Sequence, residues 1–168
     1  NGSIWWWEPD GVDDYYVGGP VHGAIREVHI GFRPTKVSSR MFIYGGRSSS
    51  ELRSYLWYSS ENFRFAVGPN PDSALASLSL NTDAVLGCSH DGSTIAVYNQ
   101  TNVVDSNAQT APTTPGAESY LGTFNNAGSP INDYFGGRIY SLFDINRLLT
   151  TAERSTVVSD AKAKAGIA

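Results

Sequence analysis

Cysteine is nearly absent from this chain. Cys88 is the single cysteine among 168 residues, so no intrachain disulfide can form. No cysteine, serine or histidine motif surrounds it to indicate a nucleophile, and we expect a small buried hydrophobe at this position. A chain without disulfides suits a protein that folds in the cytosol, including a phage protein assembled before lysis, and does not exclude a secreted bacterial domain.

Long apolar runs and blocks of like charge are missing too. No segment approaches the ~20 apolar residues that a membrane-spanning helix requires. The start, Asn1–Ile4, has neither a methionine nor the basic region of a signal peptide, which favours a processed or excised start. The formal net charge is −4. Nucleic-acid binding requires a basic face that neutralises phosphates, so we predict no nucleic-acid partner. The missing apolar run leads us to predict no membrane span.

Turn formers and aromatic rings, by contrast, are plentiful. The chain has 17 glycines and 8 prolines, with 12% aromatic and only 17% charged residues. Many turns, many aromatics and few long charged side chains favour an all-β fold. The length suits one domain that buries a sizeable core.

Alternating apolar residues predict the strands. Residues 24–32 place Val28, Ile30 and Phe32 on one face of a half-buried strand. Two hairpins are predicted, one from residues 52–59 and 62–67, the other from 84–90 and 93–99 around the strong turn signal Asp91-Gly92. Further strands are predicted at residues 40–44 and 75–80, and a long loop or irregular edge at 103–116.

The last long strand is predicted near residues 139–145. Ile139, Ser141, Phe143 and Ile145 would share one face, because successive side chains alternate across a sheet. The other face also carries apolar residues, which suits a central strand between two layers.

A short helix is predicted to close the chain. Thr150, with Glu153 three residues later, fits a capping box at the helix N-terminus. The helix would run to about Lys164, and Gly166 would end it.

This closing strand and helix resemble those of laminin-G-like domains, which belong to the concanavalin A-like lectin and glucanase superfamily. The resemblance covers roughly residues 24–165 and implies an antiparallel β-sandwich of jelly-roll type with a short C-terminal helix. The hairpin ending in residues 97–100 is similar to a tyrosine-valine-asparagine-glycine hairpin of relatives, but Gln100 replaces the glycine and leaves the shape of the next turn open. The residues that carry the resemblance are Phe135, Gly137, Ile139, Leu142, Phe143, Ile145, Leu148, Leu149, Thr150 and Glu153.

Acidic residues gather near the N-terminus. Glucanases of the superfamily carry a catalytic Glu-x-Asp-x-x-Glu on a strand, which Glu8, Asp10 and Asp13 nearly match. Pro9 breaks such a strand, so we predict a turn here and no catalytic residues. Calcium takes hard oxygen ligands and is an alternative use of Asp10, Asp13 and Asp14, although no calcium-loop spacing is matched. We predict no metal site and no required cofactor, with calcium as the open alternative.

One set of side chains is a candidate carbohydrate site. Flat aromatic rings suit the faces of pyranose sugars, arginine and histidine can donate to hydroxyls, and an exposed patch of this kind usually has a partner. The alternative is that the aromatic residues complete a core layer, since a register slip of one residue inverts the assignment. The alternation in the two hairpins turns six such residues away from the aliphatic positions: Arg53, Tyr55, Trp57, Arg64, His90 and Tyr98.

Three consecutive tryptophans precede the acidic turn. Trp6 must point opposite to Trp5 and Trp7 if they form a strand. One interpretation packs Trp5 and Trp7 into the domain. The other makes the three rings a contact surface for a partner protein, because tryptophan is enriched at interfaces.

The resemblance favours a single domain over residues 1–168, with an N-terminal segment (1–23), a sandwich (24–149) and a closing helix (150–165). The leading hypothesis is a non-enzymatic module that binds a carbohydrate polymer or cell-surface glycan, in a bacterial surface protein or a phage fibre or capsid decoration. It would act outside the cell or on the virion surface. The alternative is a purely structural virion or adhesin domain that docks through the tryptophans. A glycoside hydrolase or lyase ranks third, because no strand carries paired carboxylates.

Overall fold

The computed structural model describes residues 7–20, 25–36, 41–47, 53–59, 62–67, 74–108, 118–123, 125–126, 129–130 and 133–168. The secondary structure is almost entirely β, with a helix at the end of the chain. The elements are β1 (Tyr16–Pro20), β2 (Ile25–Pro34), β3 (Met41–Arg47), β4 (Arg53–Ser59), β5 (Asn62–Val67), β6 (Ala74–Ser77), β7 (Ala84–Asp91), β8 (Thr94–Asn99), β9 (Asn102–Ala108), β10 (Glu118–Leu121), β11 (Asn125–Asn126), β12 (Ser129–Pro130), β13 (Gly137–Ile145) and α1 (Thr151–Ala165).

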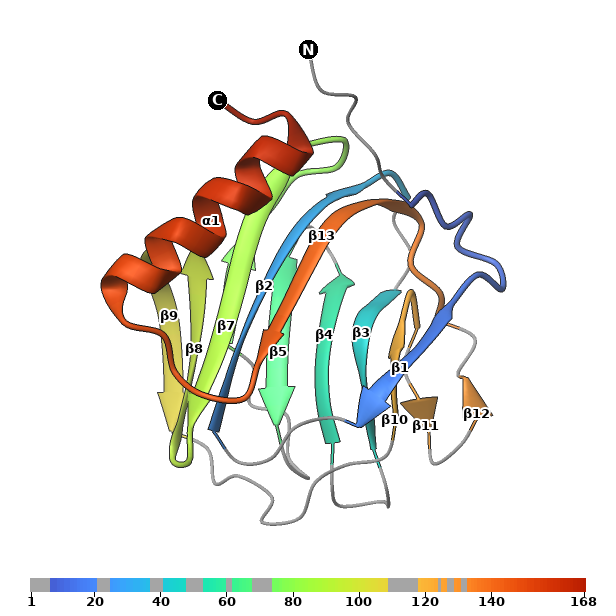
Figure 1. Cartoon of the computed structure of the whole chain (residues 1–168). Coiled ribbons are helices and arrows are strands. Elements are labelled where there is room, and N and C mark those ends of the chain that lie inside the picture. Colours follow the sequence, from blue (N-terminus) through green and yellow to red (C-terminus); the bar gives the residue numbers. More distant parts are fainter. Residues whose placement is uncertain are drawn as a thin grey trace.

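Two sheets pack face to face, and α1 lies against the outer side of one of them (Figure 1). We call the sheet with strand order β13-β2-β7-β8-β9 the helix-covered sheet. The opposite sheet has the order β1-β10-β3-β4-β5-β6, with β11 and β12 beside β3. Neighbouring strands are antiparallel except for a two-residue parallel contact between β11 and β3. The predicted antiparallel β-sandwich with a C-terminal helix is therefore confirmed.

The core fills the space between the two sheets. The ring of Phe32 on β2 lies 5.6 Å from that of Phe63 on β5 and 6.0 Å from that of Phe135, centroid to centroid, and all three are fully buried. Val28 and Ile30 are buried in the same cluster, as the alternation in this strand predicted. The strand is not half-buried, however, because Glu27 and His29 on its other face are fully buried too. Cys88 is also fully buried, and burial raises the pKa of its thiol.

An ion pair within the helix-covered sheet lies beside this core, and a tyrosine of the opposite sheet is hydrogen-bonded to it. Arg26 on β2 donates to Asp144 on β13 at 3.0 Å, and Tyr44 on β3 donates to the same carboxylate oxygen at 2.6 Å. Burial, and then the neighbouring Asp144 charge, raise the pKa of Tyr44 to about 12. The phenol therefore stays protonated and keeps its hydrogen bond across the sandwich over the whole physiological range.

The closing helix begins and ends where the sequence predicted. Thr150 accepts a hydrogen bond from the Glu153 amide, and the Glu153 carboxylate accepts one from the Thr150 amide, so the capping box is complete. Gly166 adopts a left-handed conformation with φ +69°, and its amide and that of Ile167 satisfy the last helix carbonyls.

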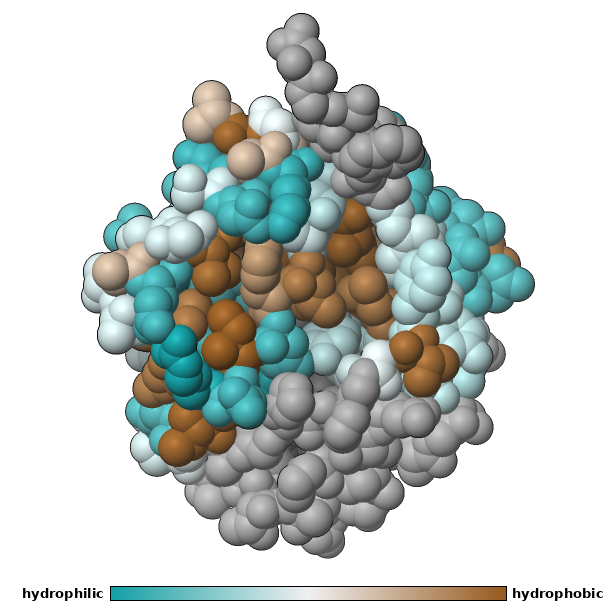
Figure 2. Space-filling model, viewed as in Figure 1, coloured by the Kyte–Doolittle hydropathy of each residue, from teal (hydrophilic) through white to brown (hydrophobic). Residues whose placement is uncertain are grey.

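The predicted faces of β13 are wrong at one position. Ile139 pairs with Phe32 and is buried in the core, whereas Ser141 pairs with Gly31 on the outer face, because a bulge at Tyr140 inserts one residue between them. Ile139 therefore does not share a face with Ser141 and Phe143. Figure 2 shows apolar residues gathered at the centre of the face that is turned to the viewer in Figure 1.

Both predicted hairpins form, and the segment after the second one is more regular than expected. Residues 103–116 were predicted to be a loop or irregular edge. β9 pairs along β8 with one register shift and forms the edge of the helix-covered sheet, while residues 109–116 lie outside the described residues. Its side chains, including Val103 and Val104, are mostly exposed. A strand without a buried face lacks the apolar alternation from which strands are predicted.

Candidate functional site

Four of the six predicted carbohydrate-binding residues lie on the β4–β5 hairpin of the opposite sheet. Trp57 pairs with Arg64 and Tyr55 with Ala66, while Leu56 pairs with the buried Phe65. Arg64 alternates along β5 with Phe63 and Phe65, whose side chains are buried in the core. On β4, Arg53 pairs with Arg47 and stands two positions before Tyr55. The exposure of Arg53, Tyr55 and Trp57 stays a prediction.

The other two predicted residues lie elsewhere, and the expectation of one outward face across both hairpins is wrong. The β7–β8 hairpin belongs to the helix-covered sheet. His90 is 1% exposed, pairs with the buried Ile95 on the core side and accepts a hydrogen bond from the Gly92 amide at 3.0 Å. Tyr98 is 6% exposed and pairs with Gly87 on the other side of the same sheet, beneath α1. Neither can extend the surface of the β4–β5 hairpin.

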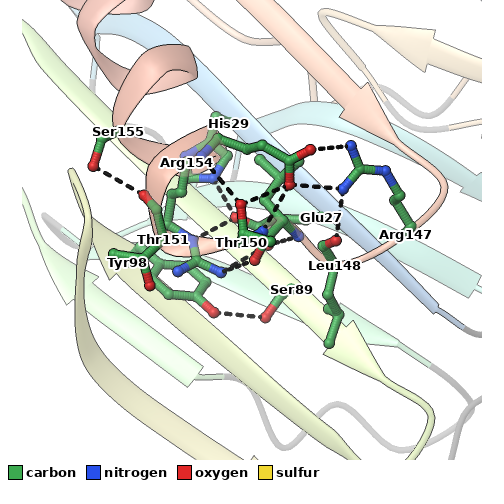
Figure 3. Close-up of polar contacts among 12 residues, drawn as sticks. Glu27, His29, Ser89, Tyr98, Arg147, Leu148, Thr150, Thr151, Arg154 and Ser155 are labelled. Carbon is green, nitrogen blue, oxygen red and sulfur yellow. Dashed lines mark hydrogen bonds and ion pairs between the residues drawn. The ribbon is translucent and has the colours of Figure 1, made fainter.

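Tyr98 belongs to a buried polar network that fixes the helix to the sheet (Figure 3). Its hydroxyl lies 3.0 Å from that of Ser89, and the guanidinium of Arg154 on α1 lies 4.5 Å above the centre of its ring. Arg154 also holds Glu27 on β2 through two hydrogen bonds of 2.6 and 3.0 Å. The helix is thus tied to two strands by one side chain.

Glu27 is the centre of this network, and all its hydrogen-bonding capacity is used. Oε1 accepts from His29 at 2.7 Å and from Arg154, while Oε2 accepts from Arg154 and from the Leu149 amide at 3.0 Å. Burial alone would raise the pKa of Glu27, but the hydrogen bonds from His29, Arg154 and Leu149 outweigh it and lower the pKa to about 2. A buried Glu beside a His resembles a catalytic pair, but this carboxylate is fully buried and fully bonded. Its role is to anchor the helix.

The N-terminal acids form a turn, as predicted. Val12 donates to the Asp10 carboxylate at 2.7 Å, and the Asp10 amide donates to Asp14 at 3.0 Å. Glu8 instead pairs with Arg138 at 3.3 Å. Within the described ranges, no three His, Cys, Asp or Glu side chains are arranged to hold a metal ion.

Trp7 is built into the domain itself. Its backbone exchanges two hydrogen bonds with Ile139, of 3.0 and 2.8 Å. Its ring lies so close to Gly122 that a Cβ there would stand 2.5 Å from it, and the φ of +92° at Gly122 also favours glycine. Trp7 therefore acts as a packing residue here. Trp5 and Trp6 fall outside the described residues.

An aromatic edge surrounds Trp7, and the sequence interpretation did not nominate it. The ring of Tyr16 on β1 lies 4.7 Å from that of Trp7, and Tyr15 stacks on Tyr120 at 4.9 Å. Tyr16 is 59% exposed and Tyr15 37%. The signal available in the sequence was the Tyr15-Tyr16 pair just before Gly18-Gly19-Pro20, where a short strand ends.

In the described part of the chain, no helix is long and apolar enough to cross a bilayer. The sequence matches no protein-family model, and no curated protein matches it either.

Solved structures, in contrast, share the fold at low sequence identity. A heptameric SAP-like pentraxin from Limulus polyphemus superposes with a TM-score of 0.70 at 14% identity, over 91% of this chain and 80% of the pentraxin. The CBM40 of a Ruminococcus gnavus IT-sialidase, bound to α2,3-sialyllactose, gives 0.66 at 12% identity over 94% of this chain and 100% of that one. The NanB sialidase of Streptococcus pneumoniae gives 0.67 at 15% identity over 91% of this chain but 28% of the sialidase. These likenesses show that the chain has a jelly-roll β-sandwich fold.

Proposed function

We propose that this domain is a non-catalytic carbohydrate-binding module, and that its site is the outward face of the β4–β5 hairpin. The observation that supports the proposal is the backbone register, in which Trp57 pairs with Arg64 and Tyr55 stands two positions before Trp57 on β4. An aromatic residue offers a flat apolar surface to a pyranose ring, and a neighbouring arginine offers donors to its hydroxyls. The sandwiches that share the fold include a CBM40 bound to sialyllactose, which supports a glycan as the ligand class.

The setting we propose is a surface outside the cell. A module of this kind serves a bacterial surface protein or a phage fibre or capsid decoration by holding it on a polymer or cell-surface glycan. The Glu27–His29 pair, which comes nearest to a catalytic constellation, is committed to anchoring α1.

The proposal is tested with a broad glycan array, run with the intact domain in the presence and absence of calcium. We expect binding by the wild-type protein and its loss in Trp57→Ala, with an unchanged melting temperature. Tyr16→Ala is the matched control, because Tyr16 is an exposed aromatic residue of the same sheet on a different strand.

Two outcomes would contradict the proposal. Binding lost in Tyr16→Ala and kept in Trp57→Ala would move the site to the aromatic edge. No binding by the wild-type protein to any glycan, with or without calcium, would favour the purely structural role in a virion or adhesin.

A further inference from the structure

A groove separate from the β4–β5 hairpin lies between the C-terminal half of α1 and the turn that follows β8. Its volume is about 380 Å³, which is within the range of small-ligand sites. Val158 and Ile167 supply apolar surface. The polar residues around them are Gln100, Thr101, Ser155, Ser159 and Lys162.

Gln100 is the unusual member of this groove, because its backbone is in the left-handed region with φ +56°. Residues with a Cβ rarely adopt this conformation, and glycine adopts it without cost. The backbone amide of Gln100 donates to the Val85 carbonyl at 3.0 Å, so the turn holds this geometry firmly. Strain of this kind is kept where the side chain has a use.

Asn81 provides an internal comparison. It is the other non-glycine residue with positive φ, at +59°, among the described residues. Asparagine tolerates this conformation because its short side chain can bond to the local backbone. Glutamine has no such advantage. The residue type therefore explains the left-handed conformation at Asn81 but not at Gln100.

We propose that this groove is a second ligand site, which takes a single saccharide unit and binds it more tightly when the unit carries a carboxylate. An apolar surface ringed by one amide, several hydroxyls and an ammonium group matches the alternating C–H and O–H groups of a sugar. Lys162 is half-buried and is the ionisable side chain among those lining the groove, so it is placed to pair with an acid group. Gln100 would then be retained for its side-chain amide group.

The test is an NMR titration of the isotope-labelled full chain with sodium glucuronate and, separately, with glucose. We expect saturable shifts at the amides of Thr101 and Ser159, with tighter binding of glucuronate. Lys162→Gln should remove the preference for glucuronate. Gln100→Gly should raise the melting temperature by about 2 to 4 °C and weaken glucuronate binding at least fivefold.

Two controls separate this site from its alternatives. Asn81→Gly changes the other left-handed residue outside the groove and should leave both affinities unchanged. Trp57→Ala should also leave the shifts at Thr101 and Ser159 unchanged, so that failure here is distinct from failure at the β4–β5 hairpin. Equal binding by Gln100→Gly and wild type, or the absence of saturable shifts with both sugars, would overturn the proposal.

Discussion

The β4–β5 hairpin lies in the opposite sheet, whereas the β7–β8 hairpin lies in the helix-covered sheet, beneath α1. Each was predicted to turn an aromatic residue away from the core: Trp57, which pairs with Arg64 in the first, and Tyr98, which pairs with Gly87 in the second. Tyr98 is nevertheless buried, because Arg154 and the rest of α1 cover it. An outward position in a strand is therefore a surface position only where nothing else packs on the sheet.

The cover over β7 and β8 is anchored by the Glu27 carboxylate, beside the apolar packing of Val158 and Ala161 against Val85. Replacing Glu27 with alanine would leave Arg154, His29 and the Leu149 amide without their shared acceptor. We expect the free energy of unfolding to fall by about 3–5 kcal/mol, the range for breaking a buried ion pair. Urea denaturation measures this loss.

Asp160→Ala is the control for this variant, since its pair with Lys164 on the same helix is half-exposed. Its unfolding midpoint should stay close to that of the wild type. Equal midpoints for Glu27→Ala and Asp160→Ala would show that Glu27 does not anchor α1.

Acid should break the same anchor. The pKa of Glu27 is lowered from 4.5 to about 2 in the folded protein. A carboxylate with a depressed pKa contributes stability above its unfolded pKa and loses this contribution as pH falls through the folded value, so the loss occurs between about pH 4.5 and pH 2. A shift of this size corresponds to about 3 kcal/mol. Stability measured from pH 7 to pH 2 should therefore fall more steeply in the wild type than in Glu27→Gln.

Glu153 also has a pKa of about 2, caused first by its hydrogen bond with Arg147. It is present in both proteins, so the difference between the two curves isolates Glu27. Parallel curves would contradict the assignment.

Local signals in the sequence were enough to predict much of the fold. The Thr150–Glu153 capping box and the Asp91-Gly92 turn were identified correctly, because their partners are a few positions apart. The alternation around Phe63 and Phe65 likewise gave the buried face of β5.

The placement of α1 and the bulge at Tyr140 could not be predicted in this way. Arg154 and Glu27 are 127 positions apart, and no pattern in either segment points to the other. The bulge reverses the faces of a strand through one inserted residue, without a glycine at that position. Tyr98 was consequently grouped with Trp57, since a sequence specifies which residues share a face more clearly than what covers that face.

The smallest expected change in stability comes from a substitution in the β7–β8 hairpin, and it separates this hairpin from the β4–β5 hairpin. Tyr98→Phe keeps the ring under Arg154 but removes the hydroxyl that lies 3.0 Å from Ser89, which is 5% exposed. A buried hydroxyl left without its partner costs about 1–2 kcal/mol. Ser89→Ala combined with Tyr98→Phe should destabilise the protein less than the sum of the single changes, because neither group is then stranded. Additive losses in this double-mutant cycle would show that the two hydroxyls do not interact.

Glycan binding should be unchanged in all three variants, since this network lies in the helix-covered sheet, whereas the site proposed on the β4–β5 hairpin lies in the opposite sheet.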